Sequence, residues 1–186
     1  AEASIYVEWS VNEKVAAEVA AGAATTGLRA LAVMKQEGLN VALDFLAHAN
    51  LIGVPGGYVI VVSDDPEGWS SAAENDSRGI IRWLGMPLLE PSTAQEAKEM
   101  TRYAFDLSEE LRLPVVIRGC TRVSHATGIV EFGPLSDVVQ TSHLDTSQNY
   151  VPTPVIPKHK ALLEKIDRVR ELFEESPLNF YEGPEN

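Results

Sequence analysis

The run of apolar residues at 58–62 constrains the fold of this chain more than any other segment. It reads Tyr-Val-Ile-Val-Val, with no polar position in it. Because successive side chains of a strand point to opposite faces, such a run indicates a strand that is covered on both sides. A second apolar run begins at Pro114. The sequence therefore predicts a three-layer α/β/α domain with a mostly parallel sheet.

Strand-like and helix-like segments alternate along the chain, which is the order expected of a parallel sheet. The expected strands are 5–9, 28–34, 58–62, 87–89, 114–118 and 129–132. The expected helices are 11–26, 39–50, 74–84, 92–112 and 158–175. We expect one domain over 1–132, an irregular connector packed on it over 133–157, a closing helix over 158–175, and a linker to a further domain over 176–186.

Composition and charge exclude several classes of function. The net charge is −12, with 27 acidic and 15 basic residues, whereas nucleic acids and anionic membranes require clustered Lys and Arg. No apolar run is long enough to span a membrane, and no signal peptide is visible. The single cysteine, Cys120, allows no disulfide framework and no multi-cysteine metal site. We therefore expect a cytoplasmic protein without nucleic-acid or membrane partners.

The ends of the expected strands carry the polar and glycine-rich segments. Ligands of open parallel sheets bind outside the carboxyl ends of the strands, where 10–13, 35–40, 63–71 and 119–125 should meet. Among the histidines only His125 lies at such an end, and the four have no metal-ligand spacing. The sequence thus predicts a ligand site at this edge and no metal site in this chain.

Glu13 is the residue at this edge with two competing interpretations. Ser10 and Glu13 have the spacing of a capping box, in which the hydroxyl caps a helix amide and the carboxylate reaches back. Alternatively, the carboxylate faces a ligand. The local pattern leaves both open.

Several segments, in order along the chain, resemble the pyrimidine-binding domain of the 2-oxoacid:ferredoxin oxidoreductases, and most of all the branch that acts on indolepyruvate. The segments that carry the likeness are Val7-Glu8-Trp9-Ser10-Val11-Asn12-Glu13-Lys14, Gly22-Ala23, Gly27-Leu28-Arg29-Ala30, Met34-Lys35, Gly38-Leu39-Asn40-Val41, Asp76-Ser77-Arg78, Leu89-Glu90-Pro91-Ser92, Gln95-Glu96-Ala97-Lys98, Thr121-Arg122 and Ser124-His125. The likeness runs from 5 to about 131 and resumes in the last helix.

The resemblance implies a thiamine diphosphate-binding fold of the pyrimidine type, whose opening strand and glycine–proline turn are absent from this chain. It implies oxidative decarboxylation of a 2-oxoacid, such as indolepyruvate or another aryl pyruvate, to acyl-CoA with electrons passed to ferredoxin. Thiamine diphosphate would be shared with a diphosphate-binding domain of the same or another subunit. Mg²⁺, 4Fe–4S clusters and a beta subunit are expected in the complete enzyme, so the isolated chain should not turn over.

The resemblance also implies roles for individual residues. Glu13 takes the place of the glutamate that contacts N1′ of the aminopyrimidine and activates the cofactor by sharing a proton with it. Lys35, Gln36, Gly38 and Asn40 form the wall beside the ring, although relatives often carry His where Gln36 stands. Residues expected to meet the substrate or a partner are Arg78, Arg122 and His125.

Two other functions remain open at this point. The chain could be a non-catalytic α/β module that uses the same surface to dock a partner. It could also belong to another thiamine-dependent 2-oxoacid oxidoreductase or to a decarboxylase.

Overall fold

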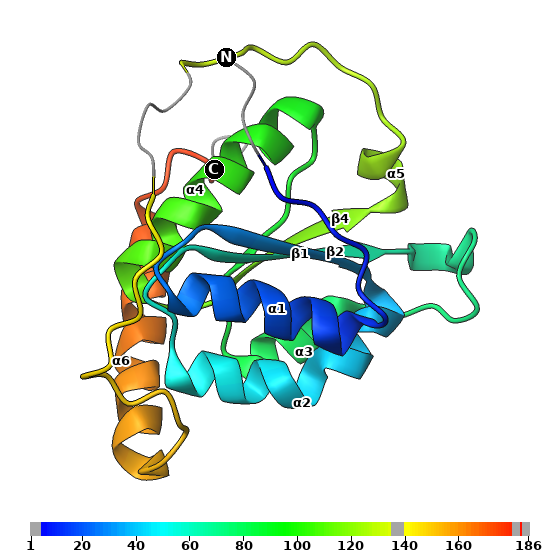
Figure 1. The fold of residues 1–186 in the computed structure, drawn as a ribbon. Helices are drawn as coiled ribbons and strands as arrows, with labels where there is room; N and C mark the ends of the chain where they lie inside the picture. Colours follow the sequence, from blue (N-terminus) through cyan, green and yellow to red (C-terminus); the bar gives the residue numbers. More distant parts are fainter. Residues whose placement is uncertain (1–4, 135–139, 180–182, 184–186) are drawn as a thin grey trace.

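A four-stranded sheet forms the centre of the computed structural model, which describes residues 5–134, 140–179 and 183 (Figure 1). The strands are β1 (Ala30–Lys35), β2 (Tyr58–Asp64), β3 (Leu88–Leu89) and β4 (Val115–Cys120). Their order in the sheet is β1-β2-β4-β3, and every described pairing is parallel. The predicted parallel sheet is confirmed.

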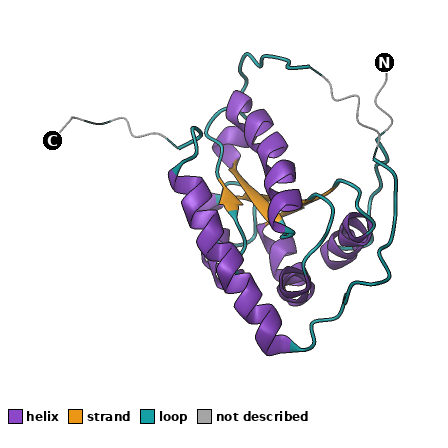
Figure 2. Ribbon diagram, turned by 90° about the vertical axis from the view of Figure 1, so that its left-hand side faces the viewer, coloured by secondary structure: helices purple, strands orange, loops and turns teal. Residues whose placement is uncertain are grey.

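Helices cover both faces of the sheet (Figure 2). The helices are α1 (Glu13–Thr25), α2 (Gln36–Ile52), α3 (Ser77–Leu84), α4 (Ala94–Leu111), α5 (Thr121–Ser124) and α6 (Val155–Glu174), with a short 3-10 helix η1 (Pro66–Gly68). One apolar cluster joins α1, α2 and α3 to the sheet, and a second joins α4 and α6 to its other face. The three-layer α/β/α prediction is therefore also confirmed.

Strand β2 lies inside the sheet, as its apolar run predicted. Tyr58, Ile60 and Val62 point into the cluster with α1 and α2, whereas Val59 points into the cluster with α4. All of these side chains are fully buried, so both faces of the strand contribute to the core. The Tyr58 hydroxyl donates to the Ala17 carbonyl at 2.9 Å, which leaves no unpaired polar atom on this tyrosine.

Two predicted strands are wrong. Residues 5–9 and 129–132 have no strand structure, and their large side chains are open to solvent, with Trp9 100% and Phe132 93% exposed. A strand needs a neighbour to pair its backbone groups, and within the described residues neither segment has one.

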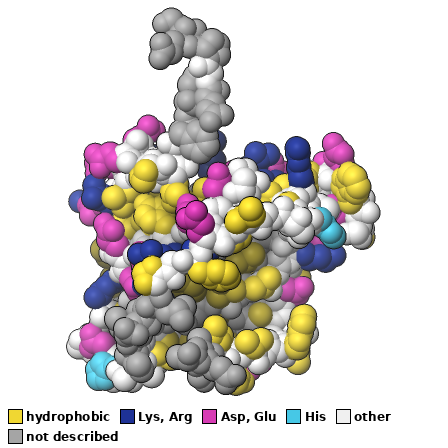
Figure 3. Space-filling view, turned by 90° about the horizontal axis from the view of Figure 1, so that it is seen from above, with side chains coloured by type: hydrophobic (Ala, Val, Ile, Leu, Met, Phe, Trp, Pro, Cys, Tyr) yellow, Lys and Arg dark blue, Asp and Glu magenta, His cyan; other side chains and the backbone are white. Residues whose placement is uncertain are grey.

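Strand β1 is an edge of the described sheet, and its side chain Val33 is 63% exposed. Apolar side chains gather between charged ones on the α4 side of the molecule (Figure 3).

Each of the five predicted helices starts two or three residues from its predicted position, and two of these shifts have a local cause. Helix α2 begins at Gln36, because Lys35 ends β1 in an extended conformation and serves directly as the N-cap. The predicted break over 35–38 is therefore the end of the strand and the first helical turn. Helix α4 is capped by Thr93, which accepts from the Glu96 amide at 3.1 Å, and Glu96 reaches back to the Ser92 amide at 2.7 Å. These bonds place the start of α4 at Ala94, two residues after the predicted 92.

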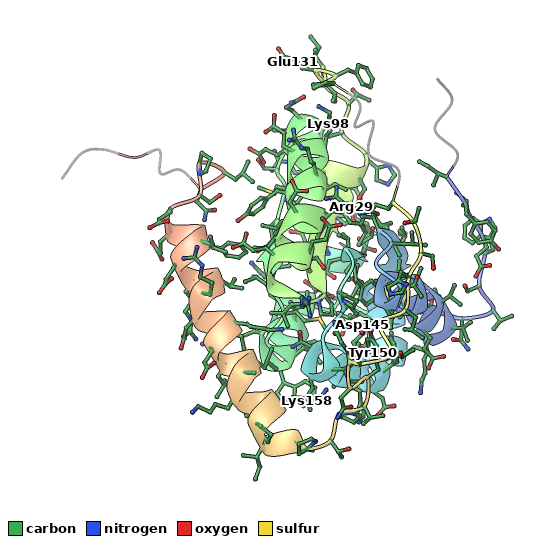
Figure 4. All side chains as sticks on the ribbon, turned by 60° about the vertical axis from the view of Figure 1, so that its left-hand side comes forward. Arg29, Lys98, Glu131, Asp145, Tyr150 and Lys158 are labelled. Carbon is green, nitrogen blue, oxygen red and sulfur yellow. The ribbon has the colours of Figure 1, made fainter. Side chains whose placement is uncertain are left out.

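The described parts of the connector are irregular and are held to the domain by hydrogen bonds (Figure 4). The His143 amide donates to the Thr26 carbonyl at 2.8 Å, and the Gln140 side chain accepts from the Arg29 amide at 2.9 Å. Just before the connector, Lys98 of α4 donates to the Glu131 carbonyl at 2.5 Å. Part of the expected connector, 135–139, and most of the end of the expected linker, 180–182 and 184–186, lie outside the described residues. Helix α6 starts three residues before the predicted 158.

The described ranges, 5–134, 140–179 and 183, contain neither a membrane-spanning helix nor a cluster of metal-ligating side chains. None of the helices in these ranges is both long and apolar enough to cross a membrane. Nor do three or more His, Cys, Asp or Glu side chains come together there in a way that could hold a metal ion.

Candidate functional site

The strand ends bring the predicted site segments to one edge of the sheet. Lys35 pairs with Ser63, and Ser63 pairs with Gly119, so β1, β2 and β4 finish side by side. The start of α2, the loop with η1, and α5 follow these ends and lie together at the right of Figure 1. This is the edge at which parallel sheets bind ligands.

Glu13 is the first residue of α1, and the capping-box interpretation of it is wrong. Asn12, with extended φ and ψ of −161° and 174°, caps the helix by accepting from the Val15 amide at 2.9 Å. Ser10 instead donates to Glu8 at 3.4 Å. A cap at Asn12 places Glu13 one residue into the helix, too early to reach back in a box. Within the described residues its half-buried carboxylate takes part in no hydrogen bond or ion pair, and so is available to a ligand.

Gly38, in the first turn of α2, lies directly beneath the Glu13 side chain. A β-carbon at Gly38 would lie 2.4 Å from Cγ of Glu13 and 3.0 Å from both Cδ and Oε1. No side chain could occupy that space without moving the carboxylate. Gly38 has an ordinary helical backbone, so the contact, rather than an unusual φ, accounts for a glycine here.

The other residues of the predicted pyrimidine wall differ in exposure. Lys35 and Asn40 are exposed, and the Lys35 ammonium lies 3.3 Å from Oε2 of Glu37. Gln36 is only 1% exposed, and both ends of its amide are used. It accepts from the Asp65 amide and donates to the Ala73 carbonyl, each at 2.5 Å. Its side chain therefore holds the loop after β2.

Asp65 is the centre of that loop. Its carboxylate accepts from the amides of Ser70 and Ser71 at 2.7 and 2.8 Å, and from the Thr121 hydroxyl at 2.8 Å. The Ser70 amide, followed by the Thr121 hydroxyl, holds the pKa of Asp65 well below its usual range. The loop is thereby closed on itself and bonded to the first residue of α5.

Arg118, near the end of β4, is a site residue that the sequence analysis missed. Its Nε donates to Asp64 and its Nη1 donates to Glu90, each at 2.5 Å, and its side chain is only 10% exposed. Asp64 also accepts from the amide and the hydroxyl of Ser77. A charged residue near the end of an otherwise apolar strand was the only signal in the sequence, and it did not reveal these partners.

The three residues predicted to meet substrate or a partner lie in different surroundings. Arg78 is exposed and forms a two-point ion pair with Asp76, at 2.8 and 2.7 Å. That pairing lowers the pKa of Asp76 to about 2. Arg122 is exposed in α5 and lines a groove of about 410 Å³ together with Arg118 and Cys120. His125 is exposed at the C-terminal end of the same helix.

The structure thus joins some of the predicted residues and not others. Glu13 contacts Gly38, and Gln36 is connected through Asp65 to the helix that carries Arg122. Across the described part of the chain, no hydrogen bond or ion pair joins Glu13 to Arg78, Arg122 or His125. Chemically, a free carboxylate beside bare backbone can share a proton with a ring nitrogen of a flat ligand.

Known proteins resemble the chain over almost its whole length. A model of the family "Pyruvate flavodoxin/ferredoxin oxidoreductase, thiamine diP-bdg" matches residues 3–171. Indolepyruvate oxidoreductase subunit IorA of Pyrococcus abyssi is 46% identical over 99% of this chain, and that of Pyrococcus horikoshii is 44% identical over 100%. The same subunit of Archaeoglobus fulgidus is 41% identical over 94%.

The match covers only part of these relatives. The chain spans 30% of the length of both Pyrococcus proteins and 29% of the Archaeoglobus protein. The family match nevertheless includes the whole sheet and both helix layers. The chain therefore belongs to the thiamine diphosphate-binding family of the pyruvate flavodoxin/ferredoxin oxidoreductases.

Proposed function

We propose that this chain is the aminopyrimidine-binding part of a thiamine diphosphate-dependent 2-oxoacid oxidoreductase that acts on indolepyruvate or other aryl pyruvates. The single observation that carries the proposal is the Glu13 carboxylate lying over Gly38 at the carboxyl edge of the sheet. The relatives named indolepyruvate oxidoreductase subunit support the choice of substrate.

The residues at this edge fit the cofactor. Glu13 has a carboxylate that the described part of the chain leaves without a partner, and Gly38 leaves room for close approach to the backbone. When bound, thiamine diphosphate supplies the carbon nucleophile that attacks the 2-oxoacid. The role of Glu13 is to hold and exchange a proton at N1′ of the aminopyrimidine. Partial burial strengthens that hydrogen bond, because less water competes for it.

Arg122 is the residue that we propose to bind an anionic group of the substrate. It is exposed beside a groove at the same edge, whereas Arg78 is already paired with Asp76. A guanidinium can hold a carboxylate through two parallel hydrogen bonds. His125, at the end of the same short helix, would lie beside the bound substrate or a partner surface.

The complete enzyme would add the parts that this chain does not supply. We propose a diphosphate-binding domain with Mg²⁺, a beta subunit, 4Fe–4S clusters, coenzyme A as acyl acceptor and ferredoxin as electron acceptor. The one cysteine of this chain cannot provide the four thiolates that such a cluster requires. Its free thiol suits a reducing compartment, in agreement with a cytoplasmic location.

The proposal is tested by Glu13→Gln in the full-length subunit assembled with its partners. Glutamine keeps the size and can still form a hydrogen bond, but it cannot exchange the proton. We expect the turnover number with indolepyruvate to fall on the order of 10²- to 10⁴-fold. Glu18→Gln is the matched control, because Glu18 lies exposed on the same helix. Thermal unfolding of both variants should stay close to that of the parent protein.

Three results would separate the alternatives. Full activity of Glu13→Gln would overturn the catalytic role and favour the interaction module. Activity that depends on Glu13 but prefers pyruvate or 2-oxoglutarate would correct the substrate. Product formation without electron transfer to ferredoxin would identify a decarboxylase.

A further inference from the structure

We propose that the hydrogen-bonded chain Gln36–Asp65–Thr121 is a positioning device that fixes the two halves of the site relative to each other. One half is the first turn of α2, which contacts Glu13 through Gly38. The other half is α5, which carries Arg122. The proposal rests on the proposed function, and it assigns roles to Asp65 and Thr121 that the family resemblance did not suggest.

Gln36 anchors the first half. Its amide oxygen accepts from the Asp65 backbone and its amide nitrogen donates to the Ala73 backbone, each at 2.5 Å. The side chain is 1% exposed, so water cannot replace either bond without opening the loop. A fully engaged amide at the start of α2 is suited to holding that turn in place, and not to contacting the ring.

Asp65 and Thr121 anchor the second half. One carboxylate oxygen of Asp65 accepts the amides of Ser70 and Ser71, and the other accepts the Thr121 hydroxyl at 2.8 Å. Thr121 is the first residue of α5 and directly precedes Arg122. A movement of Asp65 would therefore be transmitted to the arginine through one hydrogen bond and one peptide unit.

The loop between these anchors has little else to fix its position. Residues 67–70 are all exposed, and Trp69 at its tip is 76% exposed. A loop with few buried apolar contacts depends on its hydrogen bonds for a single conformation. The strand ladder joins β1, β2 and β4 up to Lys35, Asp64 and Cys120. The two side-chain bonds extend this pairing by one residue, into the start of α2, the loop after β2 and the start of α5.

The two ends of this device predict different kinetic effects. Gln36→Leu removes both amide bonds and should loosen α2 against Glu13, which raises the dissociation constant for thiamine diphosphate about tenfold. Thr121→Val removes only the hydroxyl and should displace Arg122, which raises KM for the 2-oxoacid about tenfold. Thr121→Val should leave cofactor affinity unchanged, whereas a general loss of structure would change both.

Matched controls exist on α4. Gln95 also donates one side-chain bond and accepts another, to Glu99 and from the Glu131 amide, at a more exposed position. Thr101 donates its hydroxyl to the Ala97 carbonyl at 2.6 Å. Gln95→Leu and Thr101→Val should leave the cofactor dissociation constant and the KM for the 2-oxoacid as they are. Thr121→Ser keeps the hydroxyl and should restore the parent KM.

The experiment uses the full-length subunit with its partners. Cofactor binding is followed by tryptophan fluorescence during titration with thiamine diphosphate and Mg²⁺, and KM is measured with indolepyruvate. Hydrogen exchange at the Ser70 and Ser71 amides reports the loop directly, and should quicken in Thr121→Val and in Gln36→Leu even if the latter proves too unstable to assay. Parent-like exchange and kinetic constants in both variants would overturn the positioning role. If Glu13→Gln abolishes turnover in that case, the proposed function stands without it.

Discussion

The two ends of the sheet each hold an arginine among carboxylates, but with different access to water. At the carboxyl end, Arg118 is 10% exposed and its partner Asp64 is fully buried. At the amino end, Arg29 bonds Glu109 at 2.8 and 2.6 Å and Asp106 at 2.6 Å, and its side chain is 38% exposed (Figure 4). Arg29 also lies 5.5 Å from the centre of the Phe105 ring.

The difference in exposure gives the two arginine clusters different roles. Water can replace the partners of Arg29, so that cluster fastens β1 to α4 with a modest contribution to stability. Of the partners of Arg118, Glu90 is 40% exposed but Asp64 is fully buried, so loss of the arginine would leave that carboxylate without a counter-charge or water. The buried cluster thus gives the carboxyl edge a fixed geometry, as a site there requires, whereas the amino end needs only to hold together.

The largest predicted effect is the loss of Arg118. Arg118→Met would leave Asp64 as a buried carboxylate without its counter-charge, and we expect the free energy of unfolding to fall by about 3 kcal/mol or more. Urea unfolding of the chain measures this change. Adding Asp64→Asn should recover part of the loss, because the uncompensated charge is then absent. Two additive losses would show that the residues do not act as a pair.

Gly56 and Gly38 allow the amino and carboxyl ends of the sheet to be compared through their backbone contacts. A β-carbon at Gly56, at the amino end, would lie 2.4 Å from the Leu28 carbonyl oxygen and 2.7 Å from that of Ala24. Gly56→Ala must move backbone, and should cost about 2 kcal/mol of stability. Gly38→Ala meets only the Glu13 side chain, so it should change stability by less than about 1 kcal/mol.

Gly38→Ala, which should change stability little, should have the larger effect on cofactor binding. Gly38→Ala displaces the Glu13 carboxylate and should weaken thiamine diphosphate binding in the full-length subunit, as measured by titration. Gly22→Ala is the control, because a β-carbon at this exposed position of α1 meets nothing within 4 Å. A Gly38→Ala variant with normal cofactor affinity would contradict the role given to the contact.

The sequence predicted those parts of the fold whose cause is local. The run at 58–62 predicted a strand buried on both faces, because the burial of each side chain follows from its own character. Residues 5–9 have strand-like composition and still form no strand, because pairing requires a partner chain segment that composition does not show. The capping box failed for a related reason, since Asn12 competes with Ser10 for the same helix end.

The features of the site also divide into those that the sequence predicts and those that it does not. Strand ends and glycine positions follow from pattern, so the edge and the segments around Glu13 and Gly38 could be predicted. The partners of Arg118 and Gln36 could not, because they lie on other segments and meet only through the strand register. Asp65 stands before Pro66, where aspartate is common in turns, so nothing in the sequence indicates that its carboxylate accepts three hydrogen bonds from two segments.

Acid should affect the two ends unequally. The pKa of Asp65 is lowered mainly by the Ser70 amide, and that of Glu109 mainly by Arg29. A lowered pKa stabilises the fold above the unfolded-state value, about 4, and the benefit is lost as pH falls below it. Asp65→Asn should reduce proton uptake on unfolding in this acid range by up to about one proton. Urea midpoints measured from about pH 5 downward should show a smaller reduction for Glu109→Gln, whose side chain is 29% exposed.

Salt provides the smallest and most selective contrast. Arg29→Met should cost about 1 kcal/mol at low ionic strength, since a partly exposed pair retains little of its Coulomb energy in water. At about 1 M NaCl the screening length is about 3 Å, so this loss of unfolding free energy should become smaller by a few tenths of a kcal/mol. The cost of Arg118→Met should change by a smaller fraction, because its partner Asp64 is buried and only Glu90 is within reach of the salt. Equal salt sensitivity of the two variants, measured by urea unfolding, would mean that water enters the Arg118 cluster, and the fixed geometry of the carboxyl edge would then need another source.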